Sequence, residues 1–190
     1  RGIETAPDFF TLDGGDGGTG AAPMPLMDNV GLQLDESLPM LSDILHKYGL
    51  RQRVRIIASG KRVTPVDVAW AICAGADFVN SARGFMFSLG CIQSLKCNKN
   101  TCPTGITTHN PRLQRGLDPS DKKVKVANYC KNLVHEVEVL AHSCGVDEPR
   151  QLGRKHVRIV QDTGKSVPLD EIYPRPEVAK KFMAIDSVAG

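Results

Sequence analysis

Residues 54–84 read VRIIASGKRVTPVDVAWAICAGADFVNSARG, and this stretch decides the fold. It predicts a strand over 54–58, a helix that starts at Thr64-Pro65 and ends at Gly75, and a further strand over 77–81. Strand, helix and strand at this spacing favour parallel pairing of the two strands. Ligands of such sheets gather at the carboxyl ends of the strands, so the turns at 59–61 and 82–84 mark a candidate site.

The same alternation extends to both sides of this stretch. A short strand is expected over 9–12, and apolar residues at helical spacing predict a helix that ends at Gly49. A second apolar stripe from Val126 to Cys144 predicts a long helix closed by Gly145. Residues 163–190 are expected to form an extended arm that ends in a short helix or in disorder.

The cysteines and histidines of the expected helices have ordinary structural explanations. Cys73, Cys130 and Cys144 fall among apolar helical positions, which predicts small buried residues. His135 and His142 lie seven residues apart in the long helix, and a surface pair is favoured over a metal site.

Residues 90–105, GCIQSLKCNKNTCPTG, place three thiols at C-x5-C-x4-C spacing in a loop of small and polar residues. A cluster of three irons takes one thiolate per iron, which fits Cys91, Cys97 and Cys102. Zinc would need a fourth ligand, from His109 or a distant cysteine. Disulfides are disfavoured because three neighbouring cysteines cannot all pair and because nothing resembles a secretory signal.

Three segments, in order, resemble the FMN-binding glutamate synthase family: residues 13–23 (DGGDGGTGAAP), 54–60 and 77–105. The match is to the C-terminal portion of the flavin and iron–sulfur barrel domain, in its compact stand-alone form. The resemblance implies FMN and a [3Fe-4S] cluster. It also implies reduction of the imine formed from 2-oxoglutarate and ammonia, giving glutamate. Electrons would come from ferredoxin or a pyridine-nucleotide-dependent subunit, pass through the cluster and reach the flavin, whose N5 delivers hydride.

These features predict an α/β fold that is part of a TIM (β/α)8 barrel. A complete barrel takes about 250 residues, and three strand–helix units are visible, so these are expected to be about the last three. Residues 1–110 would form the barrel part with its cysteine loop, and residues 111–190 a helical extension and tail packed on the barrel. The remaining N-terminal part of the barrel would lie on the same or another chain.

A flavin phosphate is best held by backbone N–H groups at turns. The expected cofactor-binding residues lie in the two turns and in the glycine-rich loop: Ser59, Gly60, Lys61, Ala82, Arg83, Gly14 and Gly15. Larger family members carry Asp-Gly-Gly and Gly-Thr at the turns, where this chain has Ala58, Ser59, Ala82 and Arg83. Backbone donors survive those changes, whereas the substrate specificity is open. No catalytic acid or base is assigned, since the family's substrate-binding residues lie largely in the missing part of the barrel.

Composition narrows the class of protein. The chain has 190 residues, 41% of them apolar, a net charge of +3 and no apolar run long enough to cross a bilayer. Its basic residues are scattered, which disfavours nucleic-acid binding. We expect a cytoplasmic enzyme with a small-molecule substrate, working as a homo- or hetero-oligomer. Two alternatives remain: a related FMN and iron–sulfur enzyme, for example in glutamate N-alkyl transfer, or a cluster-carrying redox subunit without a complete active site.

Overall fold

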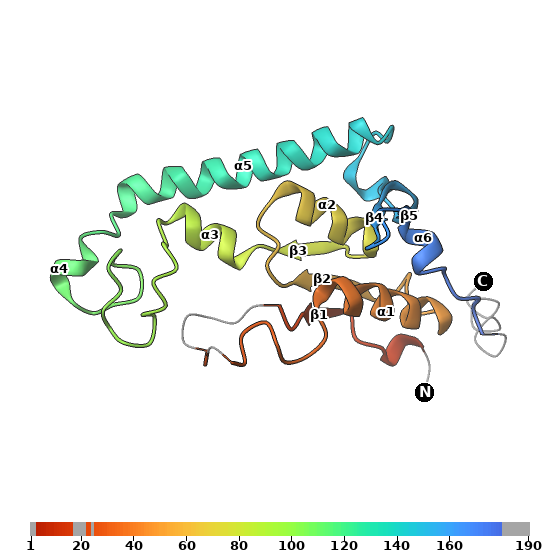
Figure 1. Cartoon of the computed structure of the whole chain (residues 1–190), viewed down its shortest axis with the longest axis horizontal. Coiled ribbons are helices and arrows are strands. Elements are labelled where there is room, and N and C mark those ends of the chain that lie inside the picture. The colour runs from red at the N-terminus through yellow and green to blue at the C-terminus, as the bar shows by residue number, and fades with distance from the viewer. Residues whose placement is uncertain (1–2, 17–21, 24, 180–190) are drawn as a thin grey trace.

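The computed structural model describes residues 3–16, 22–23 and 25–179. Its centre is a parallel sheet in the order β1-β2-β3, made of Phe9–Asp13, Arg55–Ser59 and Phe78–Asn80 (Figure 1). The register pairs Asp13 with Ser59 and Ser59 with Asn80, so the three carboxyl ends lie level. The α/β character and the parallel pairing predicted from the sequence are confirmed.

Two helices cover one face of this sheet. α1 (Leu34–Lys47) connects β1 to β2, and α2 (Pro65–Ala74) connects β2 to β3. Ile56 and Ala58 of β2 are fully buried against them. The core that they share contains Leu34, Leu38, Leu45, Val54, Ala71, Ala74, Ala76 and Leu169. Burial of this apolar surface holds the layers together.

The ends of the helices follow the signals in the sequence. Thr64 and Asp67 form a capping box at the start of α2, and Gly75 ends that helix with a φ of 126°. The predicted stop of α1 at Gly49 is also confirmed, since the Gly49 and Leu50 amides donate to the carbonyls of the last turn.

The other face of the sheet is not covered by any helix of the described residues. The register and the alternation of side chains place Phe9, Thr11, Asp13, Arg55, Ile57, Ser59, Phe78 and Asn80 on it. None of these residues is buried, and Phe9 and Phe78 are both more than half exposed. Parallel sheets normally have both faces covered. The described part of the chain supplies such a layer on one face only.

The chain leaves the sheet through α3 (Ala82–Ser88), which leads to the cysteine loop, α4 (Pro111–Gln114) and α5 (Pro119–Ser143). The loop and α4 lie together at one end of the molecule, whereas α5 runs back along α3 and α2 (Figure 1). α5 therefore connects the cysteine loop with the helical layer of the sheet.

The long helix corrects two expectations. Cys130 and Cys144 are exposed, because only Val137 and Ala141 of α5 are buried against the rest of the described chain. Cys73 is buried as predicted, and desolvation, followed by the nearby Cys144 thiol, raises its pKa to about 12. His135 and His142 are exposed, as expected for surface residues.

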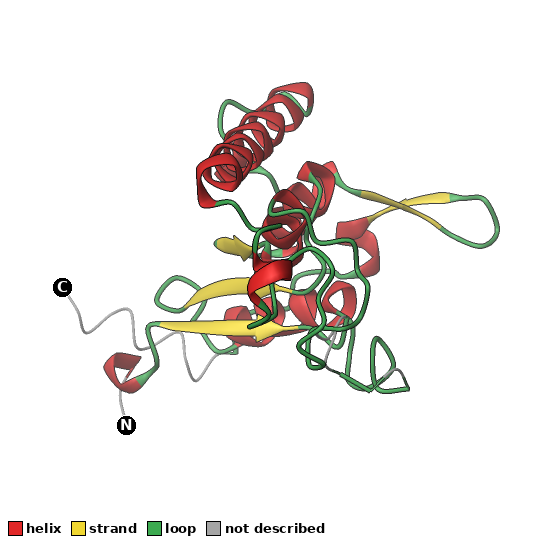
Figure 2. Ribbon diagram, turned by 90° about the vertical axis from the view of Figure 1, so that its left-hand side faces the viewer, coloured by secondary structure: helices red, strands yellow, loops and turns green. Residues whose placement is uncertain are grey.

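The described C-terminal residues form more structure than an extended arm. The 3-10 turns η2 (Pro149–Gln151) and η3 (Arg154–His156) lead to an antiparallel hairpin of β4 (Arg158–Val160) and β5 (Ser166–Pro168), followed by α6 (Leu169–Ile172). The hairpin projects from the body of the molecule (Figure 2). A further 3-10 turn, η1 (Ile3–Thr5), precedes the sheet. The short helix or disorder expected at the end of the arm falls on residues 180–190, which lie outside the described residues.

No helix in the described part of the chain combines the length and apolar character needed to cross a membrane.

Candidate functional site

The glycine-rich loop after β1 and the 59–61 turn after β2, both predicted from the sequence, meet at the carboxyl ends of these strands. The Gly14 N–H donates to the Ser59 carbonyl over 2.9 Å, and the Gly15 N–H donates to the Leu32 carbonyl over 2.7 Å. A Cβ atom on Gly14 would lie 2.7 Å from the Leu34 nitrogen, so a side chain does not fit there. Both glycines are thus explained by close contacts within the chain, in addition to any ligand that they approach. Residues 17–21 of the glycine-rich motif lie outside the described residues.

Asp16 joins this loop to the start of α1. Its Oδ2 atom accepts a hydrogen bond of 2.7 Å from the N–H of Leu34, the first residue of the helix. A carboxylate at a helix N-terminus satisfies an otherwise unpaired donor and complements the helix dipole. Asp16 thereby caps a helix that begins far along the chain.

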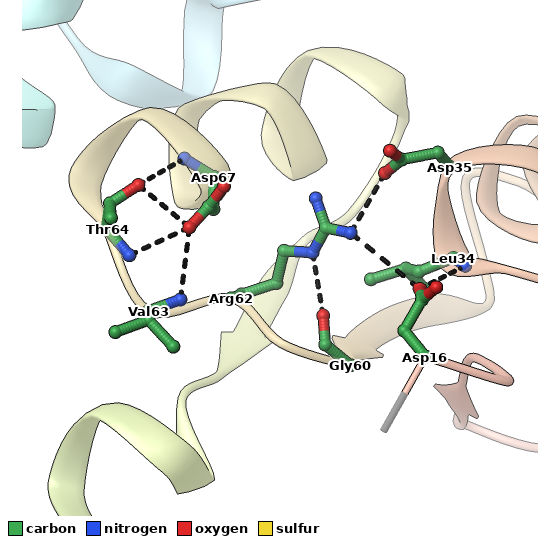
Figure 3. Close-up of polar contacts among 8 residues, drawn as sticks. All are labelled: Asp16, Leu34, Asp35, Gly60, Arg62, Val63, Thr64 and Asp67. Carbon is green, nitrogen blue, oxygen red and sulfur yellow. Dashed lines mark hydrogen bonds and ion pairs between the residues drawn. The ribbon is translucent and has the colours of Figure 1, made fainter. Parts of the chain in front are cut away.

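Arg62 lies at the centre of the polar contacts behind the 59–61 turn (Figure 3). Its Nε donates to the Gly60 carbonyl over 2.8 Å, and its guanidinium pairs with Asp35 at 2.9 Å and more loosely with Asp16 at 3.8 Å. The guanidinium carbon also lies 5.3 Å from the centroid of the Trp70 ring, within reach of a cation–π interaction. Only 9% of the side chain is exposed. One buried cation therefore holds together the glycine-rich loop, the start of α1 and the turn after β2.

The Lys61 side chain turns toward another segment. Its ammonium group pairs with the Asp28 carboxylate at 2.6 Å, so its charge is already matched within the chain. What Lys61 offers to a ligand at the end of β2 is its backbone amide, which has no hydrogen-bond partner among the described residues.

The second predicted turn is the first turn of a helix: Ala82, Arg83 and Gly84 open α3. The Tyr129 hydroxyl of α5 lies 2.7 Å from the Ser81 hydroxyl and donates to the Val63 carbonyl over 2.8 Å. The Tyr129 ring also contacts Phe85 edge to face, with 5.3 Å between the ring centroids. One side chain of α5 thus joins the turns that follow β2 and β3.

This contact depends on Gly84, which gives a testable prediction. A Cβ atom there would overlap the Tyr129 hydroxyl and lie 2.6 Å from the Ser81 Oγ. We expect Gly84→Ala to lower the free energy of unfolding by about 1–3 kcal/mol, the usual cost of overpacking. Thermal unfolding of the full-length protein measures this. Gly153→Ala is the control, because a Cβ at Gly153 meets nothing within 4 Å. Equal stability of the two variants would contradict the prediction.

The cysteine loop begins at a well-defined helix end. Gly90, with a φ of 99°, ends α3: its N–H donates to the Phe87 carbonyl, and the Cys91 N–H donates to the Met86 carbonyl. This paired arrangement is a Schellman motif. Cys91, the first candidate cluster ligand, is thus anchored at the carboxyl end of α3. Ala82 and Arg83 lie in the first turn of the same helix.

Asn100 holds the far side of the loop together. Its backbone carbonyl accepts a hydrogen bond of 2.7 Å from the Thr108 hydroxyl, and its side-chain Oδ1 accepts one of 2.6 Å from the His109 N–H. The Gln114 side chain of α4 in turn donates to the Thr108 carbonyl over 2.9 Å. The His109 amide and α4 are therefore tied to the cysteine segment through polar contacts.

The three thiols differ in their surroundings. Cys102 is buried, whereas Cys91 and Cys97 are partly exposed. Desolvation raises the pKa of the Cys102 thiol, but hydrogen bonds from Thr104 and Thr107 outweigh it and lower the pKa to about 6, which favours the thiolate. The Thr107 hydroxyl is buried and makes no hydrogen bond of ordinary geometry among the described residues, whereas the Thr104 hydroxyl lies 3.3 Å from the Cys102 sulfur.

The three cysteines share one loop without converging. Among the described residues, no three His, Cys, Asp or Glu side chains surround a common point closely enough to hold a metal ion. The donor set nevertheless fits an iron–sulfur cluster chemically, because three thiols on one loop can each supply a thiolate. His109 does not complete a zinc site in the described part of the chain.

Comparison with known proteins identifies relatives of this chain. Residues 2–147 match a family model described as the conserved region in glutamate synthase. The chain is 43% identical over 166 residues to the glutamate synthase large subunit-like protein YerD of Bacillus subtilis, covering 87% of this chain and 32% of the relative. It is 37% identical over 152 residues to the archaeal glutamate synthase [NADPH] of Methanocaldococcus jannaschii, covering 80% of this chain and 30% of that relative.

A more distant match is the glutamate synthase [NADPH] large chain of Bacillus subtilis, 29% identical over 186 residues, or 93% of this chain and 12% of the relative. The chain spans about a third of the length of YerD and of the archaeal enzyme. The family model covers most of the chain, including both turns and the cysteine loop. The chain belongs to the glutamate synthase family.

Proposed function

We propose that this chain is the C-terminal part of an FMN-binding (β/α)8 barrel and contributes about its last three βα units. Strands that follow one another in sequence and lie next to one another in a parallel sheet suit such a barrel. The uncovered face of the sheet, with exposed Phe9 and Phe78, would then face the barrel interior. Residues 1–110 would be the barrel part, and residues 111–190 an extension packed on it.

The FMN phosphate would bind at the carboxyl ends of β2 and β3. The observation that carries this proposal is the contact of Gly14 with Ser59, which joins two motifs far apart in the sequence at the level end of the sheet. The backbone amides of Gly60 and Lys61, which follow Ser59 at the end of β2, and those of Ala82 and Arg83 after β3 could donate to one anion. Gly14 and Gly15 would border the flavin from the side of β1.

Cys91, Cys97 and Cys102 would hold a [3Fe-4S] cluster as thiolates. Binding would require the loop to draw the three sulfur atoms together. The Schellman motif at Gly90 and the hydrogen bonds of Asn100 would anchor the two ends of the loop as it closes. α3 has seven residues and a length of about 10 Å. Its amino end would contact the phosphate, and its carboxyl end leads into the cysteine loop.

The reaction that fits this combination is reductive amination of 2-oxoglutarate to glutamate through an imine. When bound, FMN supplies hydride transfer and the cluster supplies one-electron transfer. The residues of this chain would bind and orient these groups, while the residues that bind substrate would lie in the remaining part of the barrel. Two relatives are named as NADPH-dependent enzymes, which supports a pyridine-nucleotide-dependent subunit as electron source alongside ferredoxin. The protein would work in the cytoplasm, within a homo- or hetero-oligomer.

The full-length protein tests the proposal. Its absorption spectrum, the identity of the released flavin, and iron and sulfide analysis should report FMN together with three irons. Turnover of 2-oxoglutarate and ammonia with a reduced donor should yield glutamate. Both cofactors with no glutamate formed would favour an enzyme with another substrate, such as glutamate N-alkyl transfer. A cluster without bound FMN would favour a redox subunit.

Arg83 gives a quantitative check of the phosphate site. A guanidinium that donates a charged hydrogen bond to the phosphate contributes about 1.5–3 kcal/mol, so Arg83→Ala should weaken FMN binding about ten- to 150-fold. Titration of the flavin-free full-length protein with FMN measures the dissociation constant. Arg53→Ala is the control, because Arg53 pairs with Asp8 beyond the amino end of β2. Unchanged affinity in Arg83→Ala would exclude the Arg83 side chain from the site.

A further inference from the structure

Arg62 directly follows the 59–61 turn, and its side chain contacts the backbone of that turn. Gly60 has a φ of 137° and Lys61 a φ of 46°, so two consecutive residues adopt the left-handed side of the Ramachandran map. Lys61 has a side chain and enters this region only at a cost in energy, which surrounding contacts must offset. The contact that acts directly on this peptide is the hydrogen bond from Arg62 Nε to the Gly60 carbonyl.

That hydrogen bond fixes the orientation of the next amide. In a trans peptide the C=O of one residue and the N–H of the next point in opposite directions. No peptide bond among the described residues is cis. The Gly60 carbonyl points toward the Arg62 guanidinium (Figure 3). The Lys61 N–H, on the other side of the same trans peptide, therefore points away from it. This amide has no partner among the described residues, so it is available to an anion at the end of β2.

The guanidinium is itself held in place on several sides. Asp35 pairs with it at 2.9 Å, Asp16 lies 3.8 Å away, and the Trp70 ring packs against it. Asp16 also accepts from the Leu34 N–H, so its position is set by the start of α1. A planar group with several donors can bind a carbonyl and a carboxylate at once, which a lysine ammonium cannot reproduce in the same geometry.

We propose that Arg62 is a positioning residue: it holds the Gly60–Lys61 peptide so that the Lys61 N–H faces the phosphate of the flavin. The inference rests on the proposed phosphate site. It assigns to Arg62 a role in recognising the phosphate without touching it. Arg62 should therefore affect the binding of FMN, which carries the phosphate, much more than the binding of riboflavin, which lacks it.

The test compares the two flavins in Arg62→Lys, which keeps the positive charge. Dissociation constants for FMN and for riboflavin are measured by fluorescence titration of the flavin-free full-length protein. We expect the constant for FMN to rise about tenfold, as for the loss of one hydrogen bond to a charged group. The constant for riboflavin should change less than about twofold, because hydrogen bonds to the phosphate contribute nothing to it. Arg53→Lys, on the surface, should change neither.

Each outcome decides something. Equal weakening of both flavins would show a purely structural role, and no weakening of either would show no role, so both results overturn the inference while the proposed function stands. A parent protein that binds FMN no more tightly than riboflavin would overturn the phosphate site itself, and the inference with it.

If Arg62→Lys does not fold, Asp35→Asn takes its place. The Asp35 side chain is 58% exposed, so this variant disturbs the core little. It removes the close partner of the guanidinium and leaves Asp16, at 3.8 Å, to face the buried charge. It should also weaken FMN binding more than riboflavin binding. An unchanged ratio of the two dissociation constants would overturn the inference.

Discussion

Replacing any one of Cys91, Cys97 and Cys102 by serine should remove the iron–sulfur cluster from the full-length protein. A three-iron cluster with three protein ligands has no spare thiolate, and a serine hydroxyl is a harder ligand that stays protonated near neutral pH. Iron and acid-labile sulfide should fall from about three and four per chain to near zero in each variant. Purification without oxygen, followed by metal and sulfide analysis, measures this.

The chain offers matched controls for this experiment. Cys130 and Cys144 are exposed on or at the end of α5 and lie outside the loop. Their serine variants should keep full iron and sulfide. FMN should remain bound in all five variants, because the proposed phosphate site and the cysteine loop lie at opposite ends of α3. Full iron and sulfide in the three loop variants would rule the ligand assignment out. If the parent protein contained zinc and no iron, the iron–sulfur cluster itself would be ruled out.

The second large effect is expected at Arg154, which is buried between α1 and the C-terminal segment. Its side chain is 3% exposed and pairs with Asp43 of α1 at 2.7 Å. It also donates to the carbonyls of Tyr173 and Pro39, at 2.6 and 3.3 Å. Arg154→Ala removes these contacts and leaves the partly exposed Asp43 carboxylate without its partner. It should therefore lower the free energy of unfolding by about 3 kcal/mol, the lower end of the range for a buried pair.

Hydrogen exchange and thermal unfolding of the full-length protein measure this loss. Exchange should increase in α1 and in α6, which Arg154 joins. Arg158→Ala is the matched control. Arg158 lies four residues further on and is exposed, and among the described residues its side chain donates hydrogen bonds only to Ser166 of the same hairpin. A stability loss in Arg154→Ala no larger than in Arg158→Ala would show that the buried pair contributes little.

The elements of the sheet could be predicted because their signals are local. Thr64 and Pro65 start α2 where expected, and Gly49, Gly75 and Gly145 end helices, since a cap needs only residues within one turn. The predicted strand ends differ from the observed ones by at most one residue. Ala82 to Gly84 were expected to form a turn and instead open α3, because a short helix of mixed residues carries no clear apolar stripe.

The errors and omissions concern contacts between distant segments. The apolar stripe of α5 wrongly placed Cys130 and Cys144 in the interior, because a stripe indicates which side is apolar and not whether another element covers it. The roles of Arg62 and Tyr129 were not predicted. The only feature of the sequence that could have drawn attention to Arg62 is its position directly after the glycine turn. Nothing in the sequence indicates that Tyr129 contacts distant turns, because aromatic residues are common on helices.

The sequence by itself determined the order and type of the elements of the sheet, the turn after β2, the cysteine loop and the family. These follow from backbone geometry and from spacing over a few residues. Only the tertiary structure decided that Gly14 meets Ser59, that Arg62 lies between Asp16 and Asp35, and that Tyr129 joins Ser81 to Val63. The physical reason is that such contacts form between groups far apart along the chain, and they exist only after burial of the shared core has brought the strands and helices together.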